Sequence, residues 1–192
     1  SGKTTQYAAI YYDLTSIKQS EKKIQYLALH DALTGLANRT LFQDRLLQAI
    51  KKARRNKGKF AILFIDLDNF KHINDTMGHP TGDKLLQELS KRLLTCGRKE
   101  DTVSRLGGDE FALILDGIEF EEEAGTVARR VIEVFSGPYE IEDKAINTTV
   151  SIGIAIYPLN GKSVEELLKN ADLAMYHVKD IGKNHFHYFT ES

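Results

Sequence analysis

Residues 104–115, SRLGGDEFALIL, decide the fold of this chain. A short strand pattern leads into Gly107-Gly108, two acidic residues follow, and a second, more apolar strand pattern completes the stretch. A Gly-Gly pair between strand patterns predicts a β-hairpin, because tight hairpin turns need positive φ angles. Glycines also allow a bulky ligand to lie directly against the backbone. Asp109 and Glu110 then begin a buried strand, where an unpaired acid is costly, so we expect a cation, most naturally a metal ion, beside them.

Taken alone, this stretch also fits an exposed hairpin tip whose charges only aid solubility, but a second acidic stretch argues against that interpretation. It follows residues 60–65, FAILFI, an uninterrupted apolar run that predicts a central strand buried on both faces. Asp66 and Asp68 stand at the carboxyl end of this strand, where open α/β sheets bind ligands. If the two strands are neighbours, their acids form a divalent-cation site. Mg²⁺ bound by a few carboxylates plus substrate phosphates serves phosphoryl transfer.

The composition fits one globular domain with a short appendage: 192 residues, 42% hydrophobic and 28% charged. A net charge of −1 gives no reason to expect nucleic acid or an anionic membrane as a partner. The single cysteine, Cys96, excludes an internal disulfide and fits the reducing cytoplasm, where we place the chain. No apolar stretch has membrane-spanning length. The start at Ser-Gly-Lys indicates a fragment, whose parent protein is free to carry a membrane anchor.

Hydrophobic periodicity divides the chain into two parts. The sequence predicts an aromatic-rich strand at residues 6–14, too short to fold alone, and a charged helix at residues 15–30. Ile17, Ile24 and Leu27 repeat on this helix at nearly heptad spacing, which fits either a short coiled-coil seam or a helix resting on its own domain. From residue 31 onward, strands alternate with helices around the hairpin, which predicts an α/β or α+β sandwich. Helices are expected at 38–57, 81–97, 119–135 and 163–180, and further strands at 138–141, 145–157 and 185–189.

The stretch RLGGDEF, residues 105–111, resembles the signature of the GGDEF family, the diguanylate cyclases. Further family motifs follow in register, and together they cover residues 31 to about 189. The resemblance implies the palm-like fold of nucleotidyl cyclases and polymerases, with a central, mostly antiparallel sheet flanked by helices. The other matching segments are DALTGLANR at 31–39, the stretch from Asp66 to Asp83, SIGIA at 151–155 and ADLAMY at 171–176.

The ends of the chain carry weaker resemblances. The N-terminal strand and helix are similar to the exit from a PAS sensor domain. We therefore expect the terminal strand of a PAS-like domain at 1–14, a connecting signalling helix at 15–30 and a GGDEF domain at 31–192. Residues 186–192, FHYFTES, resemble the junction at which family members continue into an EAL phosphodiesterase domain.

The family resemblance implies condensation of two GTP into cyclic di-GMP with release of two pyrophosphates. Each domain holds one GTP, so the reaction needs a homodimer. The implied metal ligands are Asp66, the Leu67 carbonyl and Asp109, with Mg²⁺ as the ion and Mn²⁺ as its substitute. Asp109 and Glu110 are the implied catalytic acids, which help to deprotonate the attacking hydroxyl.

Substrate contacts also follow from the resemblance. Asn74 and Asp83 match the guanine-reading residues, and a carboxylate accepts hydrogen bonds from the N1 and N2 donors that adenine lacks. Lys183 replaces the arginine of the family pattern and loses its two-pronged fit to phosphate, so we expect weaker triphosphate binding. The implied substrate-binding residues are Asn74, His79, Asp83, Phe70, Lys71, Gly107, Gly108, Lys179 and Lys183.

Arg98 and Asp101 precede the hairpin strand, and in isolation they belong to a charged loop. In register they match the family's Arg-x-x-Asp inhibitory site, where cyclic di-GMP binds as product and inhibitor. Arginine can bind both the guanine edge and phosphate. The alternative function is a catalytically weak GGDEF domain that binds GTP or cyclic di-GMP and regulates a fused EAL phosphodiesterase.

Overall fold

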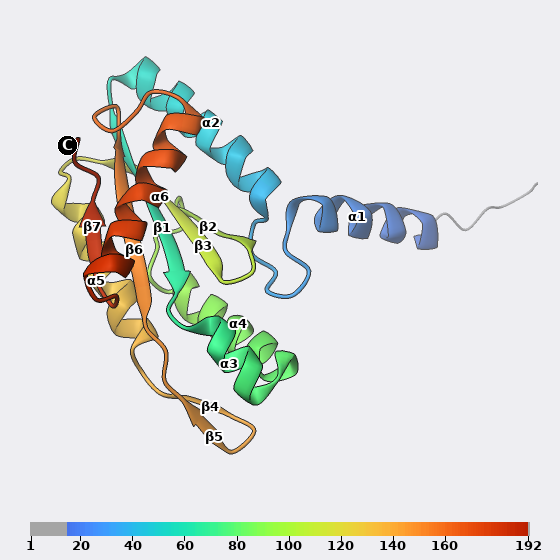
Figure 1. Ribbon diagram of the computed structural model, residues 1–192. Helices are drawn as coiled ribbons and strands as arrows, with labels where there is room; N and C mark the ends of the chain where they lie inside the picture. The colour runs from blue at the N-terminus through green and yellow to red at the C-terminus, as the bar shows by residue number, and fades with distance from the viewer. Residues whose placement is uncertain (1–14, 192) are drawn as a thin grey trace, which may run out of the picture.

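The computed structural model describes residues 15–191, so the PAS-like strand predicted at 1–14 lies outside the described residues. Figure 1 shows helices on both faces of a central sheet, with α1 projecting away from this body. The helices are α1 (Thr15–Leu29), α2 (Arg39–Asn56), α3 (Phe70–Met77), α4 (His79–Leu94), α5 (Glu122–Phe135) and α6 (Val164–Ile181). The strands are β1 (Lys59–Leu67), β2 (Thr102–Gly107), β3 (Glu110–Ile118), β4 (Tyr139–Ile141), β5 (Lys144–Ile146), β6 (Val150–Tyr157) and β7 (Phe186–Tyr188).

The main sheet has the strand order β2-β3-β1-β6-β7, which places β1 at its centre. β1 pairs antiparallel with both β3 and β6, β2 pairs antiparallel with β3, and only β7 among these described strands pairs in parallel, with β6. The mostly antiparallel sheet flanked by helices confirms the predicted fold class.

Alternating side chains of β1 build two hydrophobic cores. Phe60, Ile62 and Phe64 pack with α2 and α6 on one face of the sheet. Residues of the opposite parity, such as Leu63 and Ile65, pack with α3, α4 and α5 on the other face. This burial on both faces follows from the uninterrupted apolar sequence of the strand. Asp66 has the parity of Phe64, so its side chain leaves β1 on the α6 face.

α6 lies unusually close to the sheet because a glycine faces it. A Cβ on Gly153 of β6 would stand 1.9 Å from the Ala171 carbonyl oxygen and 2.3 Å from the Met175 nitrogen. Backbone atoms cannot give way at such distances, so only glycine permits this approach. The close packing fixes where the C-terminal end of α6 reaches the end of β1.

Some sequence-based boundaries differ from the structure. The strand predicted at 145–157 is two strands, because β5 pairs with β4 in a separate two-stranded sheet and the chain breaks before β6. α4 begins at His79, with Pro80 in its first turn, where proline's fixed φ suits a helix start. Leu47 of α2 and Leu94 of α4 are 43% and 54% exposed, so these two leucines lie outside the core.

A helix lies where one was predicted, as α1, and its role as a connecting signalling helix stays a prediction. Its Ile24 and Leu27 are 67% and 45% exposed, so these side chains do not pack on the domain in this chain. Tyr26 near its end donates a hydrogen bond to the Gly35 carbonyl at 3.2 Å, which ties the helix end to the loop before α2. The coiled-coil interpretation of the exposed residues stays a prediction. None of the described helices is long and apolar enough to cross a membrane.

Candidate functional site

The two predicted acidic strand ends are neighbours. In the pairing of β1 with β3, Asp66 stands opposite Glu110. The Leu67 backbone nitrogen also donates a hydrogen bond to the Asp109 carbonyl at 3.3 Å, which ties the hairpin turn to the end of β1. Residues far apart in sequence therefore place their acidic groups and the Leu67 backbone together, where the end of β1 meets the start of β3.

The hairpin turn is held by a largely buried arginine, Arg105. Gly107 and Gly108 have φ angles of 146° and 51°, as the Gly-Gly pair predicts. Arg105 donates to the Gly108 carbonyl from Nε at 3.1 Å and from Nη2 at 2.8 Å. Its Nη1 lies 2.9 Å from Asp31 Oδ1, and the two side chains are 11% and 23% exposed. Sequence analysis quoted both residues within motifs but assigned neither this bracing role.

Asp66 is strongly perturbed by its surroundings. Only 7% of the residue is exposed, and this burial raises its pKa from 3.8 to about 6. Its hydrogen bond with Lys179 opposes the shift, while the nearby charges of Asp109 and Glu110 add to it. Several acids that raise one another's pKa form a locally negative site, which favours a cation.

Two basic side chains of the protein form ion pairs with these acids. Lys179 Nζ, near the end of α6, lies 2.8 Å from Asp66 Oδ1. Arg39, the first residue of α2, places Nη2 3.2 Å from Glu110 Oε2 and donates from Nε to the Leu106 carbonyl at 3.2 Å. Arg39 has no role in the sequence-based prediction. Its place as the last residue of the DALTGLANR motif was the one available signal.

The residues present suit a magnesium ion. Among the described residues, no group of three or more His, Cys, Asp or Glu side chains is placed to hold a metal. Mg²⁺, however, typically takes one or two carboxylates and completes its shell with water and substrate phosphates. Asp66, the Leu67 carbonyl and Asp109 supply such a partial set of oxygens. The Lys179 ammonium already held by Asp66 shows that this carboxylate accepts a cation.

Asp68, in contrast, has a structural role. Its buried carboxylate accepts hydrogen bonds from Thr149 Oγ1 at 2.6 Å, from Ser151 Oγ at 2.8 Å and from the Asn184 backbone nitrogen at 3.2 Å. These bonds join the end of β1 to the start of β6 and to the loop after α6. The neighbouring Lys183 thereby reaches Asn69, with Nζ 2.8 Å from Oδ1. Lys179 and Lys183, both predicted to bind triphosphate, thus lie at the acidic strand ends.

The predicted base-reading residues lie on α3 and α4. Asn74 Oδ1 is buried and has no hydrogen-bond partner among the described residues. Such an orphaned acceptor calls for an explanation, and a ligand donor is one. A Cβ on Gly82 would lie 1.9 Å from this oxygen, so the glycine leaves the space that the amide occupies. His79 and Asp83 are exposed, one helical turn apart on α4.

The remaining predicted substrate residues start α3. Lys71 is exposed, in keeping with a phosphate contact. Phe70 is 8% exposed and belongs to the core beneath α4, so only its backbone is available for a contact with phosphate.

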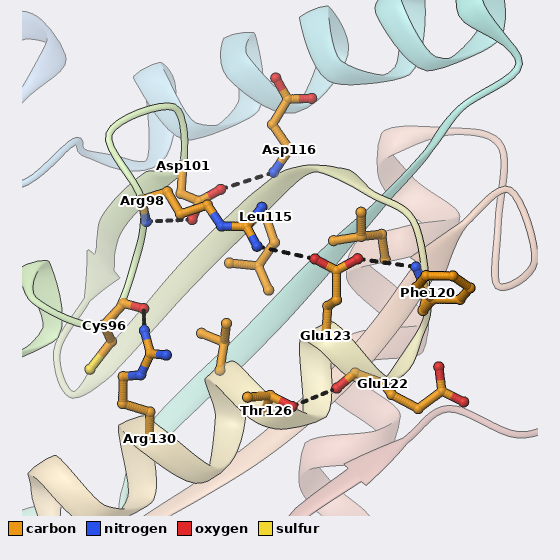
Figure 2. A pocket seen from close by; sticks show the side chains of 12 residues that line it. Cys96, Arg98, Asp101, Leu115, Asp116, Phe120, Glu122, Glu123, Thr126 and Arg130 are labelled. Carbon is orange, nitrogen blue, oxygen red and sulfur yellow. Dashed lines mark hydrogen bonds and ion pairs between the residues drawn. The ribbon is translucent and has the colours of Figure 1, made fainter.

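Arg98 and Asp101 line a different cavity, of about 380 Å³, between β3 and α5 (Figure 2). Asp101 accepts hydrogen bonds from the backbone nitrogens of Arg98 at 2.7 Å and Asp116 at 3.1 Å, while burial raises its pKa. Arg98 Nη2 lies 3.1 Å from Glu123 Oε2, and Arg130 donates to the Cys96 carbonyl at 3.1 Å. Because Thr102 pairs with Ile114, this cavity lies at the end of the hairpin strands opposite the Gly-Gly turn.

Several known proteins are similar to this chain in sequence. Residues 28–185 match the family described as "Diguanylate cyclase, GGDEF domain". The bifunctional diguanylate cyclase/cyclic di-GMP phosphodiesterase MucR of Pseudomonas aeruginosa is 46% identical over 178 residues, which are 93% of this chain and 26% of MucR. The diguanylate cyclase TpbB of the same species is 38% identical over 164 residues, which are 85% of this chain and 38% of TpbB. The chain therefore spans about a quarter to two fifths of the length of these relatives.

Solved structures share the fold. The GGDEF domain of TpbB aligns with a TM-score of 0.82 and 38% identity, over 84% of this chain and 94% of that chain. The coiled coil and GGDEF domain of DgcB from Caulobacter crescentus, solved in complex with c-di-GMP, aligns with a TM-score of 0.81 and 27% identity, over 92% of this chain and 93% of that chain. With its signature hairpin, its two acidic strand ends and these matches, the chain belongs to the GGDEF family of diguanylate cyclase domains.

Proposed function

We propose that this domain is an active diguanylate cyclase that condenses two GTP into cyclic di-GMP and two pyrophosphates. The observation that carries the proposal is the pairing of Asp66 with Glu110 across neighbouring strands, with Lys179 in contact with Asp66. Phosphoryl transfer requires acidic side chains that hold a metal ion close to basic side chains that bind the triphosphate.

In this proposal Asp66, the Leu67 carbonyl and Asp109 hold Mg²⁺, or Mn²⁺ in its place. When bound, the ion neutralises charge on the phosphates and makes the attacking hydroxyl more acidic. Glu110 accepts the proton of that hydroxyl, while Lys179 and Lys183 bind the triphosphate. Gly107 and Gly108 leave the turn without side chains, so that the nucleotide can lie against it.

Guanine recognition is proposed for the α3–α4 segment. Asp83 accepts hydrogen bonds from the N1 and N2 donors of the base, and the orphaned Asn74 Oδ1 gains a partner. A site built for these bonds leaves acceptors unpaired with adenine, which costs about 1–3 kcal/mol for each buried group. We therefore expect GTP to be preferred over ATP.

The chemistry requires two copies of the domain. Each 3′-hydroxyl attacks the α-phosphorus of the opposite GTP, forming an O–P bond and breaking the bond to the β-phosphate oxygen, so that pyrophosphate leaves. Two such attacks close the ring. A two-fold homodimer brings two sites face to face by using one surface twice. Cyclic di-GMP then binds at Arg98 and Asp101 as a feedback inhibitor.

A second candidate function is regulatory. Lys183 supplies a point charge where the family pattern has a forked guanidinium, which favours weak catalysis. The relative MucR is bifunctional, and NbdA of Pseudomonas aeruginosa, 37% identical over 92% of this chain, is a cyclic di-GMP phosphodiesterase. A weakly active GGDEF domain would bind GTP or cyclic di-GMP and regulate an EAL domain fused after residue 192, with a PAS-like sensor before residue 15.

One incubation separates the two candidates. The protein is mixed with GTP and Mg²⁺, and the nucleotides are resolved by chromatography, with ATP as the matched control substrate. The cyclase proposal predicts cyclic di-GMP from GTP and no cyclic product from ATP. GTP that remains unconverted while it still binds in calorimetry supports the regulatory candidate.

A further inference from the structure

The strongest unexplained contact joins a substrate lysine to a metal ligand. Lys179 Nζ lies 2.8 Å from Asp66 Oδ1, and the two side chains are 30% and 10% exposed. Asp66 lies in the central strand and Lys179 near the end of a helix packed against β6. A largely buried carboxylate is costly without a cation, and the lysine supplies that cation.

The same arrangement recurs at the second acid. Arg39 Nη2 lies 3.2 Å from Glu110 Oε2. This pair is more exposed, with side-chain values of 55% and 36%, and therefore holds less firmly than the Lys179 pair. Both acids that face each other across β1 and β3 are thus neutralised by the protein's own cations.

Lysine and a divalent ion compete for Asp66. An ammonium and Mg²⁺ beside one carboxylate repel each other, and water screens this repulsion little at a buried site. A nucleotide changes the balance, because its triphosphate offers the lysine new anionic oxygens. The lysine can then leave the carboxylate to the metal while every charge remains paired.

We propose that Lys179 takes the place of the divalent cation in the nucleotide-free protein and makes metal binding depend on nucleotide. Metal and triphosphate then enter the site as a pair, with Lys179 moving from Asp66 to phosphate. By linkage, the nucleotide raises metal affinity by the same factor by which the metal raises nucleotide affinity. This inference rests on the proposed function, because it takes Asp66 as a metal ligand and Lys179 as a triphosphate ligand.

Mn²⁺ alone is the direct probe, measured by electron paramagnetic resonance without nucleotide. Lys179→Met removes the competing cation and should bind Mn²⁺ at least about tenfold more tightly than the wild type, a change of about 1.4 kcal/mol. Lys183→Met is the matched control, because Lys183 Nζ contacts the neutral amide of Asn69 at 2.8 Å. Its affinity should stay within about threefold of the wild type, a change below about 0.7 kcal/mol.

Lys179→Arg keeps a cation at Asp66 and should bind Mn²⁺ as weakly as the wild type. Equal Mn²⁺ affinity in wild type and Lys179→Met overturns the proposal, as does tight binding by Lys179→Arg. Adding a GTP analogue that cannot lose pyrophosphate should strengthen Mn²⁺ binding in the wild type and much less in Lys179→Met. None of these binding measurements requires catalysis. A protein that makes no cyclic di-GMP would refute the proposed function, while the Mn²⁺ affinities would still decide this inference.

Discussion

A single methyl group added at Gly82 should weaken guanine recognition while leaving the fold intact. In Gly82→Ala the new Cβ would lie 1.9 Å from Asn74 Oδ1, 3.0 Å from its Cγ and 3.2 Å from Phe70 Cζ. Phe70 is fixed in the core, so the Asn74 side chain is the group that must move. Its amide then leaves the position from which we expect it to contact the base.

The magnitude follows from competing terms. Overpacking costs about 1–3 kcal/mol, whereas alanine in place of glycine within a helix gains about 1 kcal/mol, so the net loss of stability is about 0–2 kcal/mol. Losing one or two hydrogen bonds to the base costs about 1–3 kcal/mol of binding free energy. That loss weakens GTP binding roughly 5- to 150-fold.

Calorimetry with a non-reactive GTP analogue measures this effect, and Gly58→Ala is the control because a Cβ there meets nothing within 4 Å. The double variant Gly82→Ala/Asn74→Ala removes the clash and should bind like Asn74→Ala alone. Wild-type affinity in Gly82→Ala, or losses that simply add in the double variant, would refute the assignment of Asn74.

Three further outcomes are expected. Arg105→Met breaks the bonds to Asp31 and Gly108 and should cost about 3 kcal/mol, or roughly 6–12 °C in Tm by calorimetry; a loss no larger than that of the exposed Arg129→Met would contradict the bracing role. Arg98→Ala should weaken cyclic di-GMP binding at least about tenfold, since charge-assisted bonds contribute about 1.5–3 kcal/mol, and leave GTP binding unchanged; equal product affinities would return Arg98 to a solvated loop. Because the pKa of Asp66 rises from 3.8 to about 6 on folding, the folded state binds more protons than the unfolded state between these pH values. The stability of the protein should therefore fall as the pH rises from about 4 to about 6. Thermal melts should show this slope in the wild type, and its persistence in Asp66→Asn would rule out Asp66 as the cause.

Local sequence patterns predicted the framework of the fold. The apolar run of β1 identified the central strand, and the Gly-Gly pair identified the hairpin beside it. The break between β5 and β6 was missed because residues 147–149, NTT, include no glycine or proline to interrupt a strand pattern. Its conformation depends instead on a tertiary contact, in which Thr149 donates a hydrogen bond to Asp68, the residue that follows the central strand.

The site could be predicted from the sequence only in part. The acids and lysines could be chosen through family motifs, and the pairing of β1 with β3 brings Asp66 and Glu110 together as expected. The pairing of basic and acidic side chains depends on the packing of α6 and the start of α2, so the Lys179–Asp66 and Arg39–Glu110 ion pairs could not be predicted from local sequence. Burial of the Asn74 oxygen behind Gly82 likewise arises only when α3 packs on α4.

The most direct test of a two-strand metal and catalytic site is the rate of cyclic di-GMP formation from GTP and Mg²⁺ in matched acid variants. Asp66→Asn and Glu110→Gln keep side-chain volume but remove the charges that face each other across β1 and β3, and Asp172→Asn on the exposed face of α6 is the control. We predict a fall of at least about a hundredfold in the first two variants, with unchanged circular dichroism, and a wild-type rate in the third. Wild-type rates in Asp66→Asn or Glu110→Gln would contradict the proposed site.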